Sequence, residues 1–231
     1  MSDIPAAPRR GLILAAGALL AMPRIVRAQG GAAGGTAGGA AGNTTETPAP
    51  AAPAAAPEGD PRLTERGIGR LDAPMRVQEF MSLTCTHCAH FHKETLPKVR
   101  TELVQTGKVR LVWRDFPLDG LALAAAMTAR ALPAERYEAF IGTLFATQDR
   151  WAFTRRQDPL EELRKMAALA GMNAQQFDAV QADQALRRAV TASRVEGEQR
   201  YRVDATPSFV FGDRKESGDL SFERFAQLAA G

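Results

Sequence analysis

The chain has 231 residues and a formal net charge of +3, a length that accommodates one or two domains. Of its 29 basic and 26 acidic residues, four arginines and one aspartate fall in residues 1–28, so the rest of the chain is electrically neutral. This neutrality argues against a nucleic-acid partner and against binding to an anionic membrane surface.

Residues 1–28 are predicted to be an export signal peptide. They contain the charged pair Arg9-Arg10, a weakly apolar stretch from Gly11 to Met22, and Val26-Arg27-Ala28, which fits a small-x-Ala cleavage site. The apolar stretch is shorter than the about 20 residues that span a bilayer. The arginine pair favours the twin-arginine export route. The alternative, a buried N-terminal helix, is disfavoured because the segment has no amphipathic face.

Residues 29–60 consist almost entirely of Gly, Ala, Pro and Thr. Such a segment cannot bury enough apolar surface to fold, so it is predicted to be a disordered linker. It forms a free N-terminal tail if the signal peptide is cleaved, and a membrane tether if it is not. The folded domain is predicted to follow, over residues 61–231.

The domain is predicted to contain a strand–helix–strand unit, preceded by a short edge strand in residues 63–71. Residues 75–81 alternate and then run apolar, as a central strand does, and residues 108–116 form a second such strand. Residues 86–105 carry apolar side chains at helical spacing, with a kink at Pro97. A unit of this size predicts two parallel strands joined by a right-handed crossover.

Residues 119–203 are predicted to be helical throughout and to form an insertion. Asp158-Pro159 and Asn173 to Gln176 have the patterns of helix N-termini. None of these helices carries a histidine or a cluster of catalytic residue types, so the insertion is expected to pack on itself. A hairpin whose second strand lies at residues 216–218 follows, and Ser221 caps a final helix.

Cys85 and Cys88 are the only two cysteines of the chain, and they form a C-x-x-C pair where the first central strand meets its helix. In an oxidising compartment, paired cysteines usually stabilise the fold. A bridge across two residues, however, closes too small a loop to remove much unfolded-state entropy. The pair is therefore predicted to be a redox-active dithiol.

The position of Cys85 favours its thiolate, the species that attacks disulfides. Cys85 falls at the N-cap of the predicted helix, where the backbone N–H groups of His87 and Cys88 and the helix dipole stabilise negative charge. The His87 side chain adds a donor or a positive charge beside the same sulfur. Cys88 lies one turn further, on the apolar face of the helix, and is predicted to be the shielded, resolving cysteine.

A metal site is the alternative use of this stretch, since all three histidines of the chain fall between His87 and His92. His90 and His92 cannot face one point on a helix. Cys88 and His92 can, but one dithiol with one histidine is an incomplete zinc set. No metal site is predicted, and His90 and His92 are interpreted as solvated or packed helix residues.

The element order, the C-x-x-C at the start of the first helix and Thr206-Pro207 before the hairpin resemble an α/β thioredoxin-like fold with an inserted all-helical subdomain. More specifically, the chain resembles the DsbA-type periplasmic disulfide oxidoreductases over essentially the whole domain. The matching stretches are Asp72-Ala73-Pro74 followed by Val77 to Phe80, Thr84 to Cys88, Trp113 to Leu118, and Ala205 to Phe209.

This resemblance implies roles for three further residues, and it implies no cofactor. Glu79, six residues before Cys85, matches a glutamate that lies beneath the buried cysteine and relays its proton. The alternative, which the strand register leaves open, is an outward-facing carboxylate. Thr206-Pro207 matches a cis-proline element that lies against the active cysteine and pairs with the backbone of an extended substrate.

The resemblance predicts an exported, periplasmic thiol–disulfide oxidase that acts on unfolded or partly folded proteins with cysteines. It also implies a monomer that a membrane quinone-linked enzyme reoxidises. Thr86 stands where the family's oxidases most often carry proline, and Thr206 where several carry valine. These two threonines leave the direction of electron flow open, so a reductase or isomerase at the same site is the first alternative. A non-catalytic copper- or zinc-binding module is the second.

Overall fold

The computed structural model describes residues 59–231. The predicted signal peptide, residues 1–28, and nearly all of the predicted linker, residues 29–60, lie outside the described residues. Asp60, at the end of that linker, accepts the Arg62 N–H at 2.9 Å and so caps the short helical turn that opens the domain. Among the described residues, no helix is long and apolar enough to cross a membrane.

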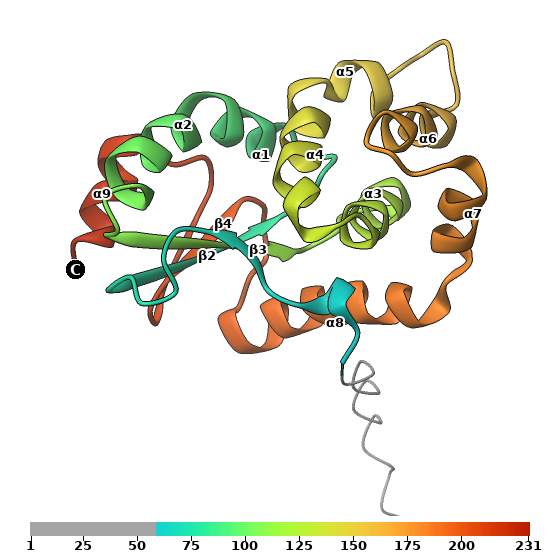
Figure 1. The fold of residues 1–231 in the computed structure, drawn as a ribbon. Coiled ribbons are helices and arrows are strands. Elements are labelled where there is room, and N and C mark those ends of the chain that lie inside the picture. Colours follow the sequence, from blue (N-terminus) through green and yellow to red (C-terminus); the bar gives the residue numbers. More distant parts are fainter. Residues whose placement is uncertain (1–58) are drawn as a thin grey trace, which may run out of the picture. The chain divides into compact units, whose positions relative to one another are not determined.

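A five-stranded mixed sheet forms the centre of the domain, with the strand order β1-β3-β2-β4-β5 (Figure 1). The two strands β2 and β3 run parallel, and the other neighbours run antiparallel. The parallel strand–helix–strand unit is thus confirmed. The strands are β1 (Arg66–Ile68), β2 (Met75–Met81), β3 (Val109–Asp115), β4 (Ser208–Phe211) and β5 (Arg214–Ser217).

The two edge strands differ slightly from their predicted bounds. β1 is shorter than the predicted segment because Pro61–Leu63 form a 3-10 turn and because Gly69, at a φ of +98°, turns the chain away. A Cβ at Gly69 would also lie 2.5 Å from the Val109 carbonyl oxygen, so only glycine fits there. β5 begins at Arg214, directly after the hairpin turn and two residues before the predicted strand.

Helices cover both faces of the sheet. The helix that follows β2 and the C-terminal helix α9 lie on one face, and α8 lies on the other (Figure 1). The helices and helical turns are η1 (Pro61–Leu63), α1 (Thr86–His90), η2 (Phe91–Thr95), α2 (Leu96–Val99), η3 (Arg100–Val104), α3 (Gly120–Ala131), α4 (Ala134–Ala146), α5 (Gln148–Trp151), α6 (Pro159–Leu169), α7 (Ala174–Ala182), α8 (Gln184–Tyr201) and α9 (Phe222–Ala229).

The helix predicted over residues 86–105 is continuous but not regular. Pro97 lies in the short segment α2, between the two π-helical turns η2 and η3. Proline has no N–H to donate to the preceding turn, so the hydrogen-bond pattern around it has to shift. The irregularity predicted at Pro97 is therefore present as two wider turns.

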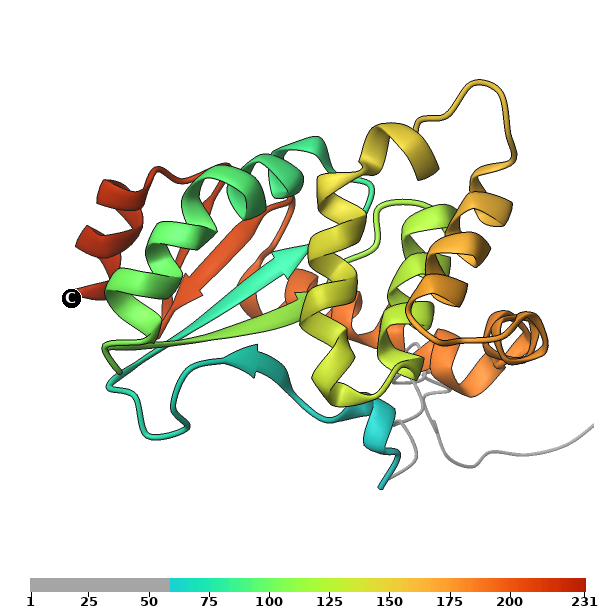
Figure 2. The same cartoon turned by 45° about the horizontal axis from the view of Figure 1, so that its top comes forward.

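The inserted helices α3 to α7 stand beside the sheet (Figure 2) and bury a common core with large side chains such as Tyr137, Phe145 and Trp151. The same core includes Cys88 and Ala89 of α1. The insertion therefore packs on itself, as predicted, and also against the helix that carries the cysteines.

A buried ion pair joins the insertion to the sheet. Arg130 of α3 donates from Nε to the Asp115 carboxylate of β3 at 2.6 Å, and from Nη1 to the Thr64 carbonyl oxygen at 2.9 Å. Both charged side chains are less than a tenth exposed. Loss of one partner would leave the other charge buried without compensation, which usually costs several kcal/mol.

Gly197→Ala tests the packing of α8 against the sheet. A Cβ at Gly197 would lie 2.8 Å from the Phe80 ring and 3.2 Å from the Phe116 ring. Overpacking of this kind costs about 1–3 kcal/mol, which outweighs a gain of up to about 1 kcal/mol in helix propensity. We expect Gly197→Ala to lower the free energy of unfolding by about 1–2 kcal/mol in urea titrations.

Gly142→Ala is the matched control, because a Cβ at this position in α4 meets no atom within 4 Å. It should stabilise the protein by up to about 1 kcal/mol. A shift of the same sign in both variants would contradict the packing argument.

Candidate dithiol active site

The cysteine pair lies where β2 ends and α1 begins. The Cys85 N–H donates to the Ser82 carbonyl oxygen at 3.0 Å, which turns the chain out of the strand. Cys85 then serves as the N-cap of α1, and its Sγ accepts the Cys88 N–H at 3.3 Å. This is the predicted position, and it directs the free N–H groups of the first helical turn at the sulfur.

Polar groups around Cys85 favour its thiolate. The Cys88 side chain, the Thr206 side chain and the backbone N–H groups of Cys88 and His87 lower the pKa of Cys85 to about 5, against the opposing effect of burial. A thiol in water titrates near 8.5. Cys85 is therefore expected to be a thiolate at neutral pH.

Cys88 has the opposite character. It is fully buried, and burial raises the pKa of the Cys88 thiol well above its usual value. Its hydrogen bond to Cys85 and the negative charges of Cys85 and Glu79 act in the same direction. The two sulfurs thus differ strongly in acidity, as expected for a reactive and a resolving cysteine.

Thr206 and Pro207 come from the segment before β4 and lie against Cys85. The Thr206–Pro207 peptide is cis. The Cys85 thiol donates to the Thr206 carbonyl oxygen at 3.3 Å. These two residues are 121 positions apart in the sequence, so the contact depends on the whole sheet.

His87 and Thr86 are both exposed in the first turn of α1. The effect of His87 on the sulfur comes from its backbone N–H. Among residues 59–231, the His87 ring makes no hydrogen bond to Cys85. This finding differs from the predicted donor role of the His87 side chain.

Glu79 lies beneath the helix and not on the outer face of the sheet. Its side chain is completely buried, so the alternative of an outward-facing carboxylate is wrong. Its negative charge contributes to the raised pKa of Cys88. The carboxylate is therefore close enough to interact electrostatically with the buried sulfur.

His92 pairs with Glu79, a contact that no sequence pattern predicts. Its Nε2 lies 3.0 and 3.2 Å from the two carboxylate oxygens, and the two side chains are 4% and 0% exposed. Cys88 and His92 are one helical turn apart on the same face. That spacing was visible in the sequence, but the partner on β2 was not.

His90 points elsewhere, with its Nδ1 in contact with the Asp219 carboxylate. The two histidines thus face different partners, as expected from their spacing of two residues. Within residues 59–231, no three side chains of the metal-ligating types come together.

Gln148 is a second residue that the sequence did not reveal. It opens α5, is buried, and donates from Nε2 to the carbonyl oxygens of Leu83 at 2.8 Å and Cys85 at 3.0 Å. These bonds satisfy backbone acceptors of the loop before α1 and hold its shape. A single glutamine among many polar helix residues has no pattern that marks it.

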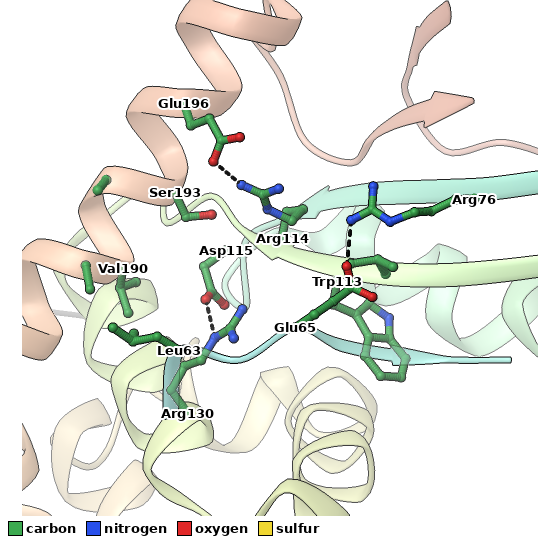
Figure 3. A pocket seen from close by; sticks show the side chains of 13 residues that line it. Leu63, Glu65, Arg76, Trp113, Arg114, Asp115, Arg130, Val190, Ser193 and Glu196 are labelled. Carbon is green, nitrogen blue, oxygen red and sulfur yellow. Dashed lines mark hydrogen bonds and ion pairs between the residues drawn. The ribbon is translucent and has the colours of Figure 1, made fainter. Parts of the chain in front are cut away.

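A cavity of about 350 Å³ lies elsewhere in the domain, between β3 and α8 (Figure 3). Its charged side chains face one another, and the ion pairs are Arg130–Asp115, Arg114–Glu196 and Arg76–Glu65. Because each of these arginines already meets a carboxylate, we interpret the cavity as a set of structural ion pairs.

A family profile described as "Thioredoxin" matches residues 62–229. The chain belongs to the thioredoxin family. A crystal structure of Wolbachia pipientis alpha-DsbA1 is 26% identical, with a TM-score of 0.65, and the match covers 72% of this chain and 89% of that one. The expected resemblance to DsbA-type proteins and the thioredoxin-like fold are confirmed.

Two less similar proteins also match this chain. Chlamydia trachomatis DsbA shares the fold at 18% identity and a TM-score of 0.56, over 80% of this chain and 96% of that one. A Rickettsia bellii protein named "Putative protein-disulfide oxidoreductase" is 24% identical over 62% of this chain and 54% of its own length. This thioredoxin-family chain therefore spans about half the length of the curated relatives it matches.

Alkylation of the reduced protein tests the pKa difference between the cysteines. Because only the thiolate reacts, we expect iodoacetamide to modify Cys85 with a midpoint near pH 5. Cys88 should remain unmodified at neutral pH. Cys88→Ala removes the strongest donor to the thiolate and should shift the midpoint of Cys85 upward. A midpoint near that of a free thiol in both proteins would contradict this assignment.

Proposed function

We propose that this chain is an exported thiol–disulfide oxidoreductase that exchanges the Cys85–Cys88 disulfide with cysteine-containing proteins, and that it acts as an oxidase. The observation that carries the proposal is the low pKa of Cys85 beside the raised pKa of Cys88. A stabilised thiolate favours the reduced form, and this makes the disulfide oxidising.

In the oxidase direction, a substrate thiolate attacks Cys85 Sγ and breaks the Cys85–Cys88 bond. Cys88 leaves with the bonding electron pair and takes up a proton, in keeping with its raised pKa. A second substrate thiolate then attacks the substrate sulfur of the mixed disulfide, and Cys85 leaves as its stabilised thiolate. Two electrons have moved from the substrate dithiol to the enzyme, and the substrate holds a new disulfide.

In this scheme, Glu79 exchanges a proton with Cys88. Two facts support this role: Glu79 is buried beneath the helix, and its charge raises the pKa of Cys88. Thr206 and Pro207 bind the substrate backbone beside Cys85, and Thr86 contributes to the redox potential. The substrates are unfolded or partly folded exported proteins. We propose that the protein works in the periplasm as a monomer. We propose further that a membrane quinone-linked enzyme reoxidises its dithiol.

A redox titration against glutathione tests the direction of electron flow. We expect a reduction potential well above the about −270 mV of thioredoxin, and rapid oxidation of a reduced, unfolded test protein. A potential near that of thioredoxin, with efficient reduction of insulin, would instead support the reductase. Tight stoichiometric copper or zinc binding without exchange activity would support the metal-binding module.

Serine variants of the two cysteines distinguish the sulfur that forms the mixed disulfide from the sulfur that resolves it. Cys88→Ser should accumulate mixed disulfides with substrate proteins, because the resolving thiol is missing. Cys85→Ser should form none, since the sulfur that forms the mixed disulfide is lost. Mass spectrometry of alkylated samples measures both.

Thr206→Val tests the contribution of the Thr206 side chain to the thiolate. The Thr206 hydroxyl is buried and has no hydrogen-bond partner within residues 59–231, so it is free to donate to a Cys85 thiolate, and the Thr206 side chain lowers the pKa of Cys85. A hydrogen bond to a charged group contributes about 1.5–3 kcal/mol, and about 1.4 kcal/mol corresponds to one pKa unit. We expect a rise of about one unit in the alkylation midpoint and a less oxidising disulfide. An unchanged midpoint would mean that the hydroxyl does not reach the sulfur.

A further inference from the structure

The buried pair of Glu79 and His92 borders on a cavity behind the cysteines. This cavity of about 370 Å³ lies between the cysteine-bearing helix and α4, and it opens to solvent. It is lined by His92, Leu96, Arg100, Trp113, Glu135, Glu138, Ala139, Ile141 and Gly142. His92 is therefore the residue that both contacts Glu79 and reaches the cavity.

The cavity is suited to hold water. It is much larger than the volume of one water molecule, and its lining includes the charged side chains of Arg100, Glu135 and Glu138. Arg100 and Glu138 form an ion pair within this lining. Trp113 also lines the cavity, and its buried indole N–H has no hydrogen-bond partner in the described part of the chain. Polar groups of this number can bind ordered waters.

The chemistry of the dithiol requires a path for protons between Cys88 and solvent. Cys88 is fully buried and must gain or lose a proton in every cycle, while the exposed face of Cys85 is covered by substrate during the reaction. Glu79 is itself completely buried, so it cannot exchange its proton with bulk water directly. A second group that links Glu79 to solvent is required.

We infer that His92 is a positioning and proton-transfer residue that connects Cys88 and Glu79 to the water-accessible cavity, so that protons leave on the side away from the substrate. This inference rests on the proposed function and deepens it. His92 Nε2 faces the Glu79 carboxylate, which leaves the other ring nitrogen, Nδ1, for exchange with water. Phe145 of α4 lies against the imidazole, with 4.2 Å between the ring centres, and holds its orientation.

The step that reveals the path is the resolution of a mixed disulfide between Cys85 and glutathione. The Cys88 thiol gives its proton to Glu79, and the Cys88 thiolate attacks Cys85 Sγ. The Cys85–glutathione bond breaks, and glutathione leaves as a thiolate with the electron pair. His92, in the tautomer that carries its hydrogen on Nδ1, accepts the proton of Glu79 at Nε2 and releases the Nδ1 proton to water in the cavity, and the reverse transfer during reduction restores the first tautomer. The oxidant is glutathione disulfide, and the products are the Cys85–Cys88 disulfide and two glutathione molecules.

The groups that face this path come from several elements. They are Cys88 of α1, Glu79 of β2, Arg100 of η3, and Tyr137, Glu135 and Glu138 of α4. These other groups also titrate or carry charge. The pH dependence of the rate at which the mixed disulfide is resolved is therefore measured in the wild type and in the variants of His92 and Glu79.

His92→Gln in the full-length protein is the decisive variant, because glutamine keeps a hydrogen-bond partner for Glu79 but cannot accept a proton on one atom and release one from another. The reduced protein is mixed with glutathione disulfide, and acid-quenched samples are analysed by mass spectrometry. We expect formation of the mixed disulfide at the wild-type rate, since Cys85 performs it. Its resolution should slow by a factor on the order of 100, the lower end of the contribution of general acid–base catalysis.

The combined variant Glu79→Gln with His92→Gln should be no slower than Glu79→Gln alone, because the two residues act in series. His90→Ala is the matched control, since His90 is exposed on the same helix and contacts Asp219 instead. Unchanged resolution in a folded His92→Gln protein, checked by its thermal unfolding, would overturn the inference.

Chemical rescue separates proton transfer from packing. In His92→Ala, added imidazole can enter the space beside the cavity and should restore resolution, whereas pyrazole has the same size but is a much weaker base and should not. Equal rescue by both azoles would mean that His92 only fills space. Failure of the proposed function gives a different result, because the wild type and His90→Ala would then form no mixed disulfide at all.

Discussion

The negative charge on the Cys85 sulfur is the constraint on which the rest of the site depends. It has to lie at the first turn of a helix, where N–H groups converge, while a second sulfur one turn away stays protonated. Three distant segments meet this requirement together. β2 delivers Cys85 to the start of α1, the segment before β4 supplies Thr206, whose side chain lowers the pKa of Cys85, and Gln148 of α5 fixes the carbonyl groups of the loop.

The sequence predicted the parts of this arrangement that depend on local patterns. Strand alternation, helical spacing and capping residues placed nearly every element, and the isolated C-x-x-C placed the reactive pair. Burial of Glu79 was uncertain, because a shift of one residue in strand register turns a side chain to the opposite face. His92 and Gln148 could not be found this way. Each acts through a partner from another element, His92 through β2 and Gln148 through the loop before α1.

The two threonines that depart from the family's usual residues do not have equal weight. Thr86 is exposed in the first turn of α1, and its neighbours His87 and Cys88 provide the N–H groups that reach the sulfur. Thr206 is different, because its own hydroxyl is buried beside Cys85 and lowers the pKa of that thiol. Of the two threonines, it is therefore Thr206 whose side chain acts on the acidity of Cys85.

The helical insertion is tied to the loop that carries the cysteines at two places. Gln148 binds the carbonyl groups of Leu83 and Cys85, and Asp119, the N-cap of α3, accepts the Thr84 hydroxyl at 2.6 Å. The loop therefore takes its shape from residues far outside its own sequence. A four-residue C-x-x-C stretch transplanted onto another thioredoxin-like scaffold would carry its sulfurs along but leave this support behind, so its reactivity is a property of the whole domain and not of a portable motif.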